Sequence, residues 1–187
     1  MKYTGFAVCF ALFISACSDP AFNPKPRAYP RVEYPEKAWQ GFQYDACDFS
    51  FEYPAYAVLL RDSSFFETAP PHPCWFNIYF PDFDGMLHFS YFQVGKPKNL
   101  DRLRDDAFEL VDWHNKKANY IEEQRIRLPN GTTGFVFNIE GPAASPFQFF
   151  LTDISRHFLR CALYFNSSVY PDSLAPLFYF VRMDFLH

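Results

Sequence analysis

Residues 74–93 read CWFNIYFPDFDGMLHFSYFQ, two apolar runs separated by the turn-forming sequence PDFDG. In the first run Phe76, Ile78 and Phe80 alternate with more polar residues, and Pro81 ends the run. An alternation of period two places such side chains on one face of a strand. Because proline, aspartate and glycine favour tight turns, the stretch predicts a β-hairpin made of residues 74–80 and 86–93.

The same alternation marks the other strands of the chain. It predicts one strand before the hairpin, at residues 49–53, and four after it, at residues 121–128, 134–140, 147–152 and 157–165.

Two stretches have helical periodicity instead. After Asn99, a good N-cap residue, apolar side chains recur every three or four positions to about Lys117. Near the end of the chain, Asp172 or Ser173 is the expected N-cap of a second helix, and Pro176 is expected in its first turn. The expected buried stripe of that helix consists of Leu174, Leu177, Phe178, Val181 and Phe185.

The order of these elements predicts an α+β fold. Strands and helices do not alternate along the chain, which argues against a parallel, doubly wound sheet. We expect one mostly antiparallel sheet of about six or seven strands, covered by the two helices. This arrangement resembles the PsbP/Mog1-like fold, and a resemblance of architecture carries no function.

The N-terminus has the pattern of an export signal. Residues 3–16 form an almost uncharged apolar run of about 14 residues, shorter than the roughly 20 of a membrane-spanning helix. Residues 14–17, ISAC, resemble a bacterial lipobox, which implies that Cys17 carries a diacylglycerol and becomes the first mature residue. The alternative is an ordinary secretory signal that contains a cysteine. We predict a signal peptide at residues 1–16.

Residues 17–40 are predicted to form a proline-rich tether, followed by one domain at residues 41–187. The segment contains five prolines, which fix the backbone and remove hydrogen-bond donors. It also carries basic and aromatic side chains that a passive spacer does not need, among them Arg27, Tyr29, Arg31 and Trp39. These side chains either pack back on the domain or contact a partner, and the sequence favours neither.

The cysteines suit an oxidising compartment. With Cys9 removed and Cys17 lipidated, three of the five remain. Cys47 and Cys74 precede neighbouring predicted strands, so we expect a disulfide between them, with buried free thiols as the alternative. Cys161 alternates with leucines and is expected in the core.

No catalytic, metal or cofactor site is predicted. The five histidines lack zinc-binding spacing, and there is no glycine-rich phosphate loop or nucleophile elbow. Asp82, Asp84 and His88 form the best polar cluster, but PDFDG is first of all hairpin sequence. Asp153 and its neighbours in TDISRH are expected to form a hydrogen-bonded turn. The net charge of −4 gives no basic face for nucleic acid.

Several long segments resemble the GldD family of gliding-motility lipoproteins. They are PKPRAYPRVEYPEKAW, CDFSFEYP, CWFNIYFPDF, FQFFLTDISRHFLRCALYFN and DSLAP, in order from Pro24 to the C-terminus. The resemblance implies a lipid-anchored envelope protein required for gliding and associated with type IX secretion, and it implies no catalytic activity. It also implies a lipidated Cys17 and the cysteines Cys47 and Cys74. Two departures are a longer segment at residues 55–73 and Cys161 at a position where the family pattern has glycine.

Two classes of function remain. The first is a non-enzymatic scaffold in the cell envelope, with its domain in the periplasm, which binds other gliding or type IX secretion proteins. The candidate contacts are Arg27, Tyr29, Arg31, Trp39 and Trp75, and the excess of aromatic residues (25 Phe and 12 Tyr) supports an exposed docking surface. The second is a periplasmic small-ligand-binding module or a hydrolase acting on envelope glycan or lipid. A further possibility is a chaperone that shields secreted clients on its aromatic face.

Overall fold

The computed structural model describes residues 31–61, 70–95, 98–167 and 171–186. Seven strands form one antiparallel sheet in the order β3-β4-β5-β9-β8-β7-β6. Their bounds are β3 (Val58–Arg61), β4 (Phe76–Phe80), β5 (Gly85–Gln93), β6 (Tyr120–Arg127), β7 (Thr133–Glu140), β8 (Phe147–Thr152) and β9 (His157–Phe165). The predicted α+β fold with a sheet of six or seven strands is therefore confirmed.

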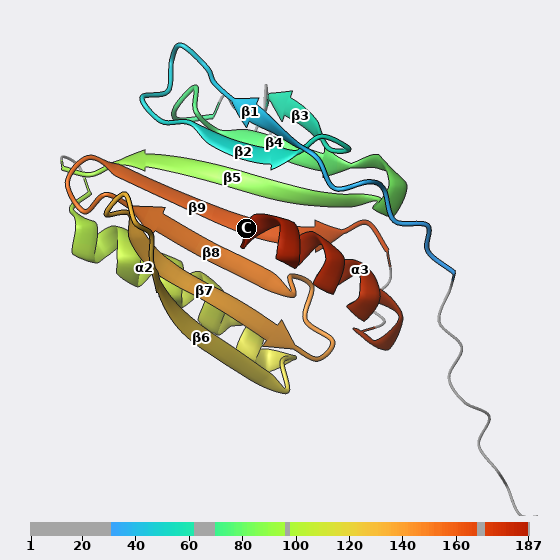
Figure 1. Ribbon diagram of the computed structural model, residues 1–187. Helices are drawn as coiled ribbons and strands as arrows, with labels where there is room; N and C mark the ends of the chain where they lie inside the picture. Colours follow the sequence, from blue (N-terminus) through green and yellow to red (C-terminus); the bar gives the residue numbers. More distant parts are fainter. Residues whose placement is uncertain (1–30, 62–69, 96–97, 168–170, 187) are drawn as a thin grey trace, which may run out of the picture.

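Two further strands, β1 (Trp39–Phe42) and β2 (Phe51–Pro54), form a separate antiparallel pair. Figure 1 shows this pair and helix α3 (Pro171–Phe185) on one face of the large sheet, and helix α2 (Leu100–Asp112) on the other. The sheet is thus covered on both faces, as the two apolar faces of its strands require.

The predicted hairpin is present as β4 and β5. A short 3₁₀ turn, η1 (Pro81–Phe83), and Asp84 in the left-handed conformation (φ 45°) connect them, so that Phe80 pairs with Gly85. The hydroxyl of Tyr79 donates to Asp84 Oδ1 at 3.1 Å, which supports the turn. Asp82 and Asp84 are therefore turn residues, as the sequence first suggested.

Helix α2 begins where predicted. The side chain of Asn99 accepts a hydrogen bond from the backbone N–H of Arg102 at 2.9 Å, which confirms the N-cap. The α-helix ends at Asp112 and continues as a 3₁₀ turn, η2 (Trp113–Lys116), so the predicted end near Lys117 was a few residues late for the α-helix. Its buried residues Leu103, Ala107 and Val111 pack on phenylalanines of β7, β8 and β9.

Helix α3 begins at Pro171, so the predicted N-cap at Asp172 or Ser173 was wrong. Proline suits the first helical position because its missing N–H has no intrahelical partner there. Pro176 consequently lies in the second turn, where it removes one helical hydrogen bond. Val181 of the predicted stripe is fully buried, and the other four residues are half-buried.

Strands β1 and β3 were not predicted. Trp39 and Gln40 were assigned to the tether, yet they pair with Pro54 and Tyr53 of β2. The tether boundary at residue 40 was therefore too late, because pairing with a strand further along the chain orders this part of it. Cys161 is fully buried, as predicted for a core residue.

Candidate functional site

Cys17, Arg27, Tyr29 and the predicted signal peptide lie outside the described residues. The described part of the predicted tether begins at residue 31, and we call residues 31–38 the strap. Val32 of the strap packs against the core, and the ring of Tyr34 lies 4.6 Å from that of Phe180 in α3. This part of the tether therefore packs on its own domain. Arg31 remains exposed beside Glu33.

The strap is held by a buried carboxylate of α3. Lys37 Nζ lies 2.6 Å from Asp184 Oδ1, and the hydroxyl of Tyr56 donates to Asp184 Oδ2 at 2.6 Å. The Lys37 ammonium also lies 5.1 Å from the centre of the Phe180 ring. Burial, together with the bond to Asp184 and its negative charge, raises the pKa of Tyr56 far above its usual range, so the phenol keeps its proton.

The sequence interpretation missed this site. Asp184 is only 4% exposed, and it follows Val181 by three positions. That spacing places the carboxylate on the buried stripe of the helix. An aspartate at the same helical spacing as the buried apolar residues is the sequence signal that could have identified this site.

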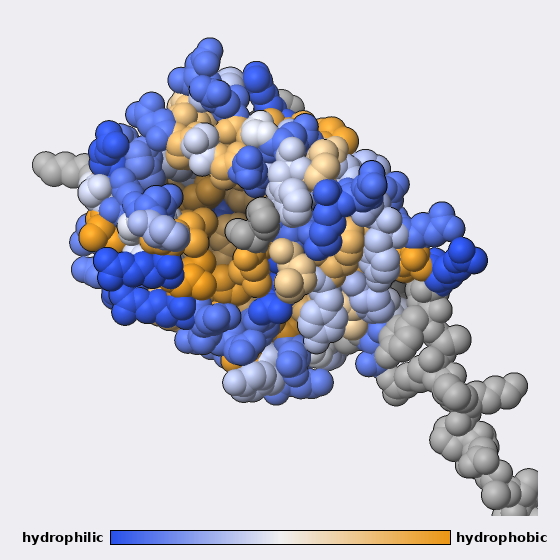
Figure 2. Space-filling view, in the orientation of Figure 1, coloured by the Kyte–Doolittle hydropathy of each residue, from blue (hydrophilic) through white to orange (hydrophobic). Residues whose placement is uncertain are grey.

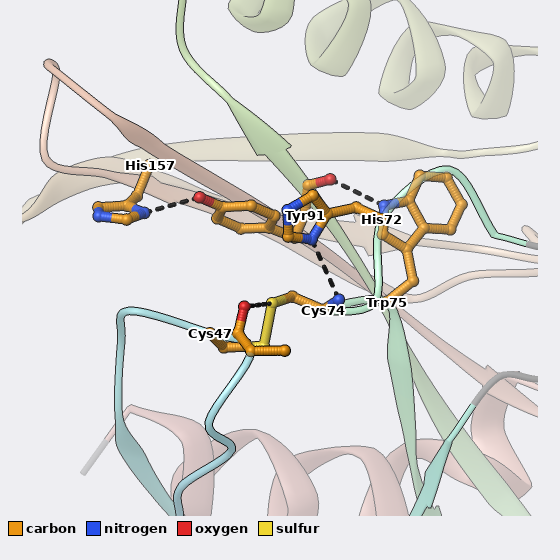
Figure 3. Close-up of a disulfide and its surroundings, with 7 residues drawn as sticks. Cys47, His72, Cys74, Trp75, Tyr91 and His157 are labelled. Carbon is orange, nitrogen blue, oxygen red and sulfur yellow. Dashed lines mark hydrogen bonds between the residues drawn. A yellow bond between two sulfur atoms is a disulfide. The ribbon is translucent and has the colours of Figure 1, made fainter.

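The expected disulfide between Cys47 and Cys74 is present, with the two Cα atoms 5.8 Å apart (Figure 3). It joins the loop that precedes β2 to the loop that precedes β4. Both cysteines are buried, which fits a structural bridge rather than an exchangeable one.

Trp75 was a predicted partner contact, and the structure contradicts this. The residue is 8% exposed, and its indole N–H donates to the carbonyl oxygen of Tyr91 at 2.8 Å (Figure 3). Its ring packs edge-on against Phe92. Trp75 is a core residue at the start of the hairpin. Trp39, another predicted contact, is half-buried in β1.

Two histidines lie on either side of Tyr91 beside the disulfide (Figure 3). The ring of His72 is 4.6 Å from that of Tyr91, and the Tyr91 hydroxyl is 2.8 Å from His157 Nδ1. Burial lowers the pKa of His72. Burial, followed by the charges of Asp48 and Asp153, raises the pKa of Tyr91. His157 Nε2 is itself buried and has no hydrogen-bond partner among the described atoms, so this nitrogen does not face solvent.

The predicted polar clusters are structural. Asp84 accepts from Asn166 as well as Tyr79, whereas His88 bonds Asn77 across the hairpin. Asp153 Oδ1 accepts backbone N–H groups of Ser155, Arg156 and His157, which confirms the hydrogen-bonded turn. Within the described part of the chain, no group of three or more histidine, cysteine, aspartate or glutamate side chains is arranged to hold a metal ion.

A half-open cleft of about 210 Å³ lies between the β7–β8 connection and α3. Its lining is mostly apolar and includes Ala143, Pro146 and Phe178, with Glu140 and Tyr179 among the more polar residues. It is smaller than the roughly 300–1,000 Å³ of typical ligand pockets. It contains none of the predicted site residues.

An apolar hollow lies on the face of the sheet that carries α3. Figure 2 shows apolar residues gathered in a hollow over β8 and β9, with hydrophilic residues around it. Strand register places Ile126, Leu151 and Leu159 on this face, each of them half-buried. We call these three residues the hollow residues.

A sequence model described as "Gliding motility lipoprotein GldD" matches residues 19–187. The chain belongs to the GldD family. The resemblance read from the sequence is thus confirmed over the whole predicted mature chain except its first two residues. As a member of a lipoprotein family, this GldD protein is a membrane-anchored protein of the cell envelope with a role in gliding motility.

Other comparisons add little to the GldD assignment. A solved structure similar to this chain is cyanobacterial PsbP (CyanoP) from Synechocystis sp. PCC 6803, with 11% identity and a TM-score of 0.43, covering 87% of this chain and 98% of that one. A comparison with curated proteins gave no match. In the regions that the structure describes, no helix is long and apolar enough to cross a membrane.

Proposed function

We propose that this GldD protein is a non-enzymatic assembly component of the gliding machinery and the associated type IX secretion apparatus. A lipid on Cys17 anchors it, its domain lies in the periplasm, and it acts by binding other envelope proteins of the apparatus. The strap carries this proposal. The segment that leads from Cys17 is bound to α3 through the buried carboxylate of Asp184. A strap bound in this way fixes the point at which the tether leaves the domain, which suits a scaffold.

The hollow residues supply the partner surface in this proposal. Apolar patches rimmed by polar residues are typical of protein-binding sites, and burying them on a partner gains free energy. Trp75 is excluded from this role by its burial, and the exposed Arg31 lies on the strap.

The anchor is tested by labelling cells with palmitate. We expect the wild type and Cys161→Ser to take up the label, and Cys17→Ser to lose both the label and gliding. Label that survives in Cys17→Ser would contradict the anchor.

The partner surface is tested by photo-crosslinking in intact cells. A photoreactive amino acid at Leu151 is expected to give adducts with other gliding or type IX secretion envelope proteins, identified by mass spectrometry. The matched control is Arg125, an exposed residue of β6 that register places on the opposite face of the sheet. Equal adducts from both positions, or none with such proteins from Leu151, would contradict the proposal.

The second candidate, a small-ligand-binding module or hydrolase, is favoured by the cleft beside α3. A ligand in this cleft would contact Tyr179, which is 59% exposed. Loss of gliding in Tyr179→Ala, with unchanged crosslinking from Leu151, would favour this candidate over the scaffold.

A further inference from the structure

A ring of polar side chains surrounds a small residue on the face of the sheet that carries α2. Ala162 of β9 pairs with His88 of β5 and with Gln148 of β8. Arg160 and Tyr164 are its neighbours on the same face, two positions before and after it along β9. The rings of His88 and Tyr164 lie 5.5 Å apart. Four side chains that can donate hydrogen bonds thus meet around one methyl group.

Arg160 has no counter-charge among the side chains that the structure describes. Its Nη2 donates to Gln148 Oε1 at 2.7 Å, and this acceptor is a neutral amide. Among residues 31–61, 70–95, 98–167 and 171–186, no carboxylate lies within 4.0 Å of its guanidinium. Burial lowers the pKa of Arg160, although the group stays charged at neutral pH. A half-buried cation of this kind gains strongly from an anionic partner.

The Gln148 amide adds an unsatisfied donor. Arginine only donates hydrogen bonds, so the amide oxygen must face Arg160. Its Nε2 is therefore fixed next to the guanidinium, and it is buried with no acceptor among the described atoms. Buried donors without acceptors cost free energy and are rare in folded proteins.

The groups whose charges shift the pKa of Arg160 also include no aspartate or glutamate. His114 lies in η2, close to Arg160. Burial lowers the pKa of His114 most, and the positive charge of Arg160 lowers it further. Tyr164 and Cys161 are the groups that oppose the lowering of the Arg160 pKa, and neither is a carboxylate.

We propose that Arg160 and Gln148 bind a small oxyanion, a carboxylate or a phosphate group. The planar guanidinium presents paired N–H groups that match two oxygens of such a group, and the Gln148 N–H donates beside them. The strap and the hollow residues lie on the opposite face of the sheet, so this site is independent of the proposed scaffold function.

Thermal unfolding of the full-length protein in detergent tests the site. Phosphate and acetate are compared with chloride at equal ionic strength and pH 7. At about five times Kd, the bound anion should raise Tm by about 2–4 °C. Arg160→Gln should abolish this rise, whereas Arg125→Gln, on the exposed strand β6, should keep it. Protection by only one of the anions would identify the oxyanion, and protection by neither would overturn the proposal.

Gln148→Glu provides a second test that does not depend on removing the arginine. It places a carboxylate against Arg160 in the shape of the native amide. We expect a higher Tm in chloride and no further rise with phosphate or acetate. Gln124→Glu, the same change on an exposed position of β6, should leave the anion response intact. An anion response that persists in Gln148→Glu would overturn the proposal even if Arg160→Gln did not fold.

Discussion

Lys37 Nζ lies 2.6 Å from Asp184 Oδ1, although the two residues are 147 positions apart in the chain. The Asp184 side chain is 1% exposed and that of Lys37 is 44% exposed. The Lys37 ammonium keeps part of its hydration. Forming this ion pair therefore costs less desolvation free energy than forming a pair in which both groups are buried. The pair is also less screened than a surface pair. This contact, with the Tyr56 hydroxyl, binds the strap to α3.

Asp184→Asn should therefore release the strap. The amide oxygen can still accept from Tyr56, but Lys37 loses its counter-charge. We expect a loss of about 1–3 kcal/mol in the free energy of unfolding, measured by urea denaturation. Proteolysis within residues 31–38 should become faster.

The matched control is Glu33→Gln, which removes the exposed partner of Arg31. Surface pairs contribute little, so the change should stay within about 0.5 kcal/mol. Equal effects of the two substitutions would show that the buried carboxylate does not hold the strap.

Removing the disulfide should destabilise the domain. Cys47 and Cys74 are 27 positions apart, and closing a loop of this size contributes about 3–4 kcal/mol in the chain-entropy model. The variant Cys47→Ser/Cys74→Ser should lose about this amount in urea denaturation, and reductant should then have no further effect. Cys161→Ala, which leaves the bridge intact, should keep its response to reductant.

The turn at Asp153 should make stability depend on acid pH. Burial opposes ionisation of the carboxylate, but hydrogen bonds from His157, Arg156 and Ser155 outweigh it and lower the pKa to about 2. The ionised form therefore stabilises the fold above the unfolded pKa near 4, and this contribution is lost as pH falls towards 2.

Asp153→Ala should lower the free energy of unfolding by about 0.5–2 kcal/mol at pH 7. The difference from the wild type should shrink as the pH is lowered from about 4 to about 2, and denaturation at several pH values measures it. A difference that stays constant down to pH 2 would argue against the carboxylate as the cause.

Gly134→Ala should be severely destabilising. Gly134 pairs with Leu151, and a Cβ at this position would overlap the carbonyl oxygen of Phe150. Because a backbone atom cannot move aside cheaply, we expect a loss of about 3 kcal/mol or more. In Gly41→Ala the new methyl meets no atom within 4 Å, and circular dichroism melting should show a much smaller change.

The sequence predicted the elements whose side chains alternate or recur clearly. Phe76, Ile78 and Phe80 are all buried, and the hairpin follows from them. Strand β3 was missed because only Leu59 of its four residues is even half-buried, so no alternation is visible. β3 is a strand because its backbone pairs with the edge of β4, and this contact with another part of the chain is not visible in the local sequence pattern.

The site residues were harder to predict. Trp75 lies one residue before β4, so the alternation of the strand does not determine which way the Trp75 side chain points. The side chain is buried because it contacts Phe92 and the carbonyl oxygen of Tyr91.

The cysteine pairing was predicted correctly although β2 and β4 belong to different sheets. The two strands pack face to face, with the rings of Phe51 and Phe76 stacked, so the loops that precede them come together. The bond between Lys37 and Asp184 could not be predicted, because local patterns carry no information about a contact over that distance in the chain.

The ladder between β5 and β9 also has a consequence for folding kinetics. All other neighbours in the large sheet are consecutive strands, so residues 58–93 and 120–165 form two meanders whose pairings close shorter loops. Residues 85–93 and 157–165 alone join the two meanders within the sheet. Closing this long loop costs the most chain entropy, and we expect it to limit the refolding rate. In stopped-flow experiments, substitutions in this ladder should slow refolding, whereas substitutions in β6 should mainly speed unfolding.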